Sequence, residues 1–199
     1  MKKIVLIGDS IRLGYDKYVK DALEGVAQVY YPNDSARFSE YTLRYLSDWK
    51  HDNGWGEDID LVHWNTGLWD VLEMYGEEPI SNPQQYGETI AKISRQIKIL
   101  FPHAKQIFAT NTSVIEEKYG WDRKRHNATI EQYNKIAIKA LADTMTESET
   151  ASEKAVQIAE SLAPAKAEPF EQTDPLREKL PVPPFFTPSP SFEKNLKNT

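Results

Sequence analysis

Cysteine is absent from the chain, and two other absences are nearly as informative. Without cysteine there is no disulfide, no thiolate metal site and no cysteine nucleophile, although the absence says little about compartment. A glycine-rich phosphate loop is also missing, because residues 8–14 have neither the GxGxxG spacing nor a Walker lysine. The four histidines show no metal-ligand spacing. We therefore expect neither a metal ion nor an organic cofactor.

Long apolar runs are missing as well. Only four apolar residues separate Lys3 from Gly8, which is too few for a signal peptide, and no run approaches transmembrane length. The sequence therefore predicts a cytoplasmic protein with no membrane partner. Acidic residues outnumber basic ones by 30 to 24, and the net charge of −6 argues against a nucleic-acid partner. The 199 residues, 40% of them hydrophobic, suffice for one globular domain, but they do not indicate its oligomeric state.

Strand-like and helix-like segments alternate through the first 142 residues. Parallel strands that are joined by helices require right-handed crossovers. The pattern therefore predicts a three-layer α/β/α fold of the flavodoxin-like type, with a parallel sheet in the order 2-1-3-4 and a doubtful fifth strand. We expect strands at residues 3–7, 26–31, 59–64 and 105–110, and helices at residues 11–23, 38–49, 83–100 and 127–142.

The composition changes after residue 142. Residues 151–162 keep a helical periodicity, but eight of the chain's twelve prolines follow residue 163. Proline cannot donate a backbone hydrogen bond, so we expect residues 163–199 to form an extended or disordered tail behind a domain of residues 1–162. Residues 181–184 have the PxxP form of a peptide ligand, and a tail without a partner is the simpler interpretation.

The tripeptide Gly8-Asp9-Ser10 directly follows the first expected strand. Ligands bind at the carboxyl ends of the strands in an open parallel sheet. A serine just ahead of a helix also lies near the positive end of the helix dipole, which suits a nucleophile that must support a developing negative charge. The alternative is that Asp9 or Ser10 only caps the helix.

Two further loops, after the second and third expected strands, reach the same edge. Acyl transfer needs a nucleophile together with donors that are aimed at the tetrahedral oxyanion. Ser10 is the candidate nucleophile, and its own amide is one candidate donor. The other candidate donors are a backbone amide of Ser35 or Ala36 and the side chain of Asn65. Asn65 is alternatively a turn residue that bonds to its own backbone.

These loops resemble those of the SGNH (GDSL-type) hydrolases over residues 1–142. Ile7-Gly-Asp-Ser-Ile11 is similar to the block that carries the family's nucleophilic serine, and His63-Trp-Asn65 is similar to its third block. The resemblance implies a cofactor-free hydrolysis of small carboxylic esters, such as acetyl groups on a carbohydrate, through an acyl-serine intermediate. The family's second block offers a glycine, which this chain lacks between Gly25 and Gly54.

The family's last block is an Asp-x-x-His motif, and its histidine is the general base. The nearest formal match, Asp143-Thr-Met-Thr146, has threonine in that place. Among the histidines only His126 follows the fourth expected strand, so it is the candidate replacement, with a surface histidine as the alternative. Loss of the base costs several orders of magnitude in rate. A catalytically impaired binding protein, or the product of a truncated or altered gene, is therefore the second hypothesis.

Further side chains at this edge are candidates for contacts with the substrate. Asp9 is expected to bond to loop amides beneath Ser10, and Arg37 and Asp70 are expected to orient the substrate or to bond to each other. Aromatic residues there wall a pocket or belong to the core. The candidate substrate-binding residues are Asp9, Ser35, Ala36, Arg37, Trp69 and Asp70, with Trp64, Leu68 and Tyr119 as further pocket walls.

Overall fold

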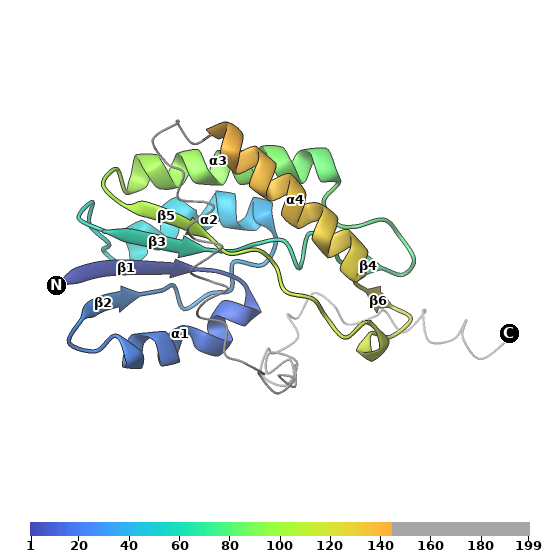
Figure 1. The fold of residues 1–199 in the computed structure, drawn as a ribbon, viewed down its shortest axis with the longest axis horizontal. Helices are drawn as coiled ribbons and strands as arrows, with labels where there is room; N and C mark the ends of the chain where they lie inside the picture. The colour runs from blue at the N-terminus through green and yellow to red at the C-terminus, as the bar shows by residue number, and fades with distance from the viewer. Residues whose placement is uncertain (145–199) are drawn as a thin grey trace, which may run out of the picture. The chain divides into compact units, whose positions relative to one another are not determined.

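The computed structural model describes residues 1–144 of the chain. Its centre is a four-stranded parallel sheet in the order β2-β1-β3-β5, which is the predicted order because β5 is the fourth strand of this sheet along the chain. Helix α1 covers one face, and α2, α3 and α4 lie on the other (Figure 1). The elements are β1 (Lys2–Ile7), α1 (Ser10–Ala22), β2 (Ala27–Tyr30), α2 (Ser39–Asp52), β3 (Leu61–Trp64), β4 (Glu73–Met74), α3 (Pro83–Leu100), β5 (Lys105–Phe108), the 3₁₀ helix η1 (Glu116–Lys118), β6 (Arg123–Lys124) and α4 (Asn127–Thr144).

This arrangement confirms the predicted three-layer α/β class and the predicted order of the four parallel strands. The predicted helix at 151–162 and the predicted tail at 163–199 lie outside the described residues. No helix within residues 1–144 is both long enough and apolar enough to cross a bilayer.

Strand β1 lies at the centre of the sheet and is buried on both faces. Its residue Val5 pairs with Tyr30 of β2 and Val62 of β3, and Ile7 pairs with Trp64 at the carboxyl end of β3. Val5, Ile7 and Val62 have no exposed surface, as expected for the central strands of a sheet with helices on both sides. Because the pairs are parallel, the loops that follow β1, β2 and β3 all leave from one edge.

Helix α3 forms where the sequence predicts it, because both its start and its buried face are strongly encoded. Asn82 caps the first turn by accepting a hydrogen bond from the Gln85 amide at 2.9 Å, and Pro83 follows in the first turn. Ile90, Ile93 and Ile97 then recur on the face that packs into the core.

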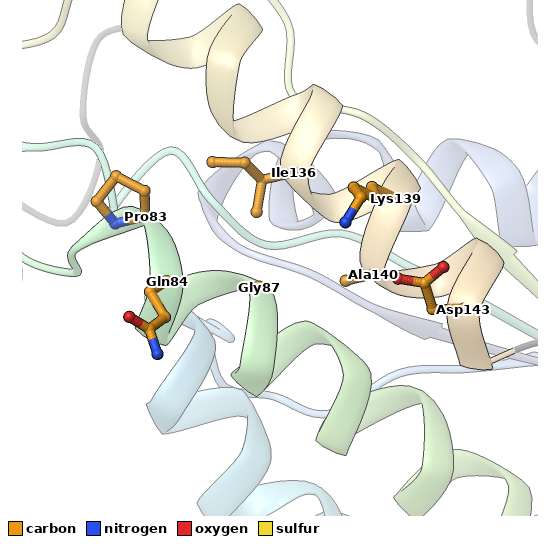
Figure 2. Close-up of a pocket in the computed structure, with 7 residues that line it drawn as sticks. All are labelled: Pro83, Gln84, Gly87, Ile136, Lys139, Ala140 and Asp143. Atoms are coloured by element: carbon orange, nitrogen blue, oxygen red, sulfur yellow. The ribbon is translucent and has the colours of Figure 1, made fainter.

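Helices α3 and α4 pack closely at Gly87. A Cβ atom there would lie 2.9 Å from Cγ2 of Ile136, so the absence of a side chain permits this approach. A shallow groove of about 340 Å³ runs beside the contact (Figure 2). It is lined only by residues of the two helices and by none of the loop residues at the carboxyl edge of the sheet: Pro83, Gln84, Gly87, Ile136, Lys139, Ala140 and Asp143.

Strands β4 and β6 form a second, antiparallel sheet that the sequence did not reveal. Glu73 pairs with Lys124 and Met74 with Arg123, so each strand is two residues long and shows no readable alternation of polar and apolar residues. We call this element the β4–β6 ribbon. It lies beyond the carboxyl ends of the parallel strands (Figure 1).

The buried face of α3 predicts the effect of two matched substitutions. Ile93→Ala removes a side chain with no exposed surface and should lower the free energy of unfolding by about 2–5 kcal/mol. Ile99→Ala makes the same change in the same helix where the side chain is 77% exposed, and it should cost less than about 1 kcal/mol. Urea unfolding of both variants measures the difference, and equal losses would contradict this packing.

Candidate active site

Ser10 is the first residue of α1 and is exposed at the carboxyl end of β1. The cap of this helix is Asp9, whose Oδ1 accepts a hydrogen bond from the Ile11 amide at 3.0 Å. The capping alternative therefore applies to Asp9, and the Ser10 hydroxyl is not the cap of the helix. Ser10 thus stands at the positive end of the α1 dipole with its side chain toward solvent.

Asp9 also connects β1 to β3. The Asn65 side-chain amide donates to Asp9 Oδ1 at 3.3 Å, and both side chains are buried. Burial raises the pKa of Asp9, while the bonds from Ile11 and Asn65 and the positive charges of Arg125 and Arg12 act in the opposite direction. The side chain of Asn65 therefore faces the start of α1 rather than its own backbone.

Gly8 is the residue that permits this contact. A Cβ atom at position 8 would lie 2.2 Å from Asn65 Oδ1 and 2.6 Å from Arg12 Cβ. Real Cβ atoms do not approach other atoms so closely, so any side chain here would push β1, Asn65 and α1 apart. The glycine of Gly8-Asp9-Ser10 is thus required by the packing beneath Ser10.

The loop after β2 is tied to the same point. We expected the amide of Ser35 or of Ala36 to face an oxyanion, and the Ala36 amide donates instead to the carbonyl oxygen of Gly8 at 2.9 Å. The Ser35 hydroxyl accepts a hydrogen bond from the Arg37 amide at 3.3 Å. Arg37 has a positive φ of 48°, and its guanidinium lies 3.7 Å from Asp34. A backbone amide has one hydrogen, and those of Ala36 and Arg37 are used in these bonds, so Ser35 carries the amide of this loop that could still face a ligand.

Asp70 lies in the interior rather than facing a ligand, and it does not bond to Arg37. Its side chain has no exposed surface and accepts hydrogen bonds from the Ser39 amide at 3.0 Å, the Ser39 hydroxyl at 2.5 Å and the Ser81 hydroxyl at 2.7 Å. Burial raises the pKa of Asp70, and the bonds from Ser39 and Ser81 partly offset this effect. Since Phe38 at the N-cap of α2 makes no side-chain capping bond, Asp70 caps α2 from a distance.

His126 immediately precedes α4 and lies between two carboxylates. Its Nδ1 is 2.9 Å from Glu116 Oε2, and its Nε2 is 3.6 Å from Glu73 Oε2. The carboxylates face opposite nitrogens of the ring, so they do not converge on a point where a metal ion could bind. Residues 1–144 hold no cluster of three His, Asp or Glu side chains suited to a metal. Within the same residues, the polar contacts of His126 do not include Ser10.

The other histidines lie elsewhere. His51 is near the end of α2 with a side chain that is 90% exposed, and His103 is exposed in the turn before β5. His63 lies within β3, where its Nδ1 is 3.5 Å from the Tyr15 hydroxyl and burial lowers its pKa.

Arg125 was missed by the sequence analysis, although it bonds to the loop after β3. Its Nε donates to the carbonyl oxygen of Leu68, and its Nη1 donates to the Tyr119 hydroxyl at 2.9 Å. Trp69, the residue after Leu68, is half-buried. Trp64 is fully buried against Phe108 and belongs to the core. No spacing in the sequence distinguishes Arg125 from the other basic residues between β5 and α4.

Several solved structures have a fold similar to that of this chain. The chain is similar to TesA, with a TM-score of 0.52 and 15% identity over 72% of this chain and 74% of that one. It is similar to the psychrotrophic esterase EstA from Pseudoalteromonas sp., with a TM-score of 0.50 and 13% identity over 72% of this chain and 74% of that one. It is also similar to the acetyl xylan esterase AlAXEase, with a TM-score of 0.53 and 14% identity over 71% of this chain and 73% of that one. No family model and no curated protein sequence matches the chain. At these identities the likeness is one of fold.

The bonds of Asp70 predict a large loss of stability when they are removed. Asp70→Ala leaves the buried donors of Ser39 and Ser81 without an acceptor and should lower the free energy of unfolding by about 2–4 kcal/mol. Asp48→Ala is the control, because it breaks the exposed pair with Arg44 and should cost about 0.5 kcal/mol or less. If chemical denaturation gives similar losses for the two, Asp70 does not hold these segments together.

Burial of His63 predicts a pH dependence. Its pKa in the folded chain lies below the ordinary 6.5, so below pH 6.5 the unfolded chain binds a proton that the folded chain does not. The free energy of unfolding that depends on neutral His63 is therefore fully present above pH 6.5, and it decreases as the pH falls. Stability should thus decline less between pH 7.5 and 5.5 in His63→Gln than in the native chain, while exposed His103→Gln should follow the native curve. A His63→Gln curve parallel to the native one would show that His63 is not the source.

Proposed function

We propose that this chain is a serine hydrolase of the SGNH type that cleaves carboxylic esters with Ser10 as its nucleophile. The observation that carries the proposal is the position of Ser10, exposed at the first turn of α1 while Asp9 provides the cap. The fold shared with EstA and the acetyl xylan esterase supports the same class of reaction. Neither likeness identifies the catalytic residues, so their roles are argued from the geometry.

In this reaction the Ser10 hydroxyl oxygen attacks the ester carbonyl carbon, and its proton passes to a base. The carbonyl oxygen becomes an oxyanion, which the Ser10 amide at the start of α1 is placed to bind. The Asn65 side chain gives one hydrogen to Asp9 and has a second for the oxyanion, and the Ser35 amide is the remaining donor from the loop after β2. The alcohol then leaves with a proton, and water hydrolyses the acyl-serine to release the acid.

His126 is the proposed base. Its Nδ1 bonds to Glu116, which orients the ring as a carboxylate orients the histidine of a catalytic triad. Its Nε2 is then the nitrogen that accepts the Ser10 proton, and to do so the ring must turn from Glu73, which lies 3.6 Å away. The proposed pair therefore requires the segment between β6 and α4 to move toward Ser10 when the substrate binds.

A second candidate function is a binding protein of the same fold without catalytic activity. The observation that favours it is the position of His126, whose contacts in the described part of the chain are with Glu116 and Glu73 rather than with Ser10. Such a protein would bind an ester at the same edge without cleaving it. The two candidates differ in one measurable property, which is turnover.

Hydrolysis of p-nitrophenyl acetate by the purified full chain tests the proposal. Ser10→Ala should lower the rate of hydrolysis about a thousandfold or more, because it removes the nucleophile. His126→Ala should lower the rate by a comparable factor, because it removes the base. Ser47→Ala and His103→Ala are matched controls at exposed positions away from this edge and should keep native activity.

Each alternative outcome has a distinct meaning. Activity that survives Ser10→Ala would reject the proposed nucleophile. Activity that depends on Ser10 but survives His126→Ala would reject His126 as the base. A native chain that is folded by circular dichroism but has no turnover above the Ser10→Ala background would favour the binding protein.

A further inference from the structure

Two large aromatic side chains are exposed side by side next to the β4–β6 ribbon, one directly after β4 and the other two residues before β6. Trp121 is 80% exposed and Tyr75 is 66% exposed, and their ring centroids are 5.7 Å apart at an interplanar angle of 62°. Both rings keep most of their surface in water although they contact each other. Single exposed apolar residues are ordinary, whereas contiguous exposed apolar surface is characteristic of binding sites, and these two rings form such a contiguous surface.

The backbone that presents Tyr75 is strained. Tyr75 and Gly76 have φ values of 56° and 80°, and the Glu77 amide donates to the Met74 carbonyl at 3.0 Å. These are the features of a type I′ turn, whose first central position favours asparagine, aspartate or glycine and disfavours a bulky side chain. The conformation therefore costs stability that the exposed Tyr75 ring does not recover by burial. Strain of this kind gathers at ligand-binding sites.

The pair is connected to the edge that carries Ser10. The Tyr75 amide donates to the Asp122 carbonyl at 3.0 Å, which joins the turn to the segment of Trp121. Arg125 directly follows β6 and bonds to Leu68 in the loop that begins with Asn65. The ribbon lies beyond the carboxyl ends of the parallel strands (Figure 1), and Ser10 begins α1 directly after the carboxyl end of β1.

The size and surroundings of the pair select its partner. Two aromatic side chains bury about 300–500 Å² together, whereas a stable protein interface needs about 800 Å² from each side. An anionic lipid surface is disfavoured by the net charge of −6. A sugar ring fits instead, because its apolar C–H face packs on an aromatic face. The neighbouring Asp122 and Arg123, 3.9 Å apart, can accept from and donate to its hydroxyl groups.

We propose that Tyr75 and Trp121 form a carbohydrate-binding subsite that holds a glycan chain whose ester group reaches Ser10. The ester part of this inference rests on the proposed function, while the binding of the glycan does not. A sugar residue stacks on the exposed face of Trp121, and Tyr75 holds the indole in position from the strained turn. The inference adds the place on this chain, beside the β4–β6 ribbon, that would hold the sugar part of an acylated oligosaccharide.

Calorimetric titration of the full-length chain tests the subsite without requiring turnover. The probes are xylotetraose, cellotetraose and mannotetraose, and at least one should bind. Trp121→Ala and Tyr75→Asn should each weaken that binding about five- to tenfold, as expected for the loss of one aromatic contact. Tyr18→Ala, which removes a 74% exposed aromatic ring from α1, should bind as the native chain does.

Thermal unfolding separates a binding role from a structural one. Tyr75→Asn places a favoured residue in the type I′ turn and should raise Tm by about 2–4 °C while it weakens sugar binding. A Tm that falls would mean that Tyr75 serves the fold, and it would overturn the proposal. Absence of binding for all three tetrasaccharides, or equal binding by the native chain and Trp121→Ala, would overturn it too.

Turnover provides the link to Ser10. Trp121→Ala should lower kcat/KM on acetylated xylan about five- to tenfold more than it lowers kcat/KM on p-nitrophenyl acetate, because only the first substrate extends to the ribbon. A chain that binds a tetrasaccharide but cleaves neither substrate would reject the proposed function and keep the subsite. If Trp121→Ala cleaves acetylated xylan and p-nitrophenyl acetate as well as the native chain does, the subsite is rejected and the proposed function is kept.

Discussion

The buried carboxylate of Asp70 is the constraint on which the carboxyl edge of this sheet depends. Asp70 has no exposed surface, and burial of a carboxylate is costly unless it is hydrogen-bonded. Its partner Ser39 begins α2, and its partner Ser81 precedes α3. Thr66, in the loop after β3, also lies 3.5 Å from Asp70. One acidic side chain therefore fixes where two helices start relative to the loop that carries Asn65. The starts of these helices and the loop after β3 lie at the same edge of the sheet as Ser10, so this buried carboxylate stabilises the surroundings of the candidate nucleophile.

Beneath Ser10, the polar groups divide into those that hold the structure and those that face outward. Asp9 caps α1 and accepts from Asn65, while the Ala36 amide is used by Gly8. Asp9 and Ala36 were candidates for contacts with the substrate, but these hydrogen bonds already use their polar groups. The bonds do not use the Ser10 amide at the first turn of α1. In the segment between β6 and α4, Arg125 bonds to Leu68 and His126 bonds to Glu116, and both partners belong to other segments. The chemistry of the site thus depends on contacts between segments far apart in the chain.

The sequence predicted those parts that are encoded locally. Apolar runs gave the four parallel strands, and the spacing of Ile90, Ile93 and Ile97 gave α3. The β4–β6 ribbon was missed because strands of two residues have no periodicity and pair across about fifty residues. The position of Asp70 was misjudged because its partners Ser39 and Ser81 are adjacent to it only in the fold. Ser10 and Asn65 were brought to one edge by topology, while their roles in catalysis stay predictions.

The two crowded glycines at this edge limit how the site can change under mutation. At Gly67, where φ is 141°, a Cβ atom would lie 2.2 Å from the Asn111 amide nitrogen and 2.7 Å from the Tyr86 hydroxyl. Gly8 is equally enclosed. Any other residue at either position would therefore displace the backbone or its neighbours, whereas Trp69, two residues beyond Gly67, has a side chain that is only half-buried. Substitutions at this edge can therefore change its exposed side chains, whereas the backbone beneath Ser10 and in the loop after β3 depends on these two glycines.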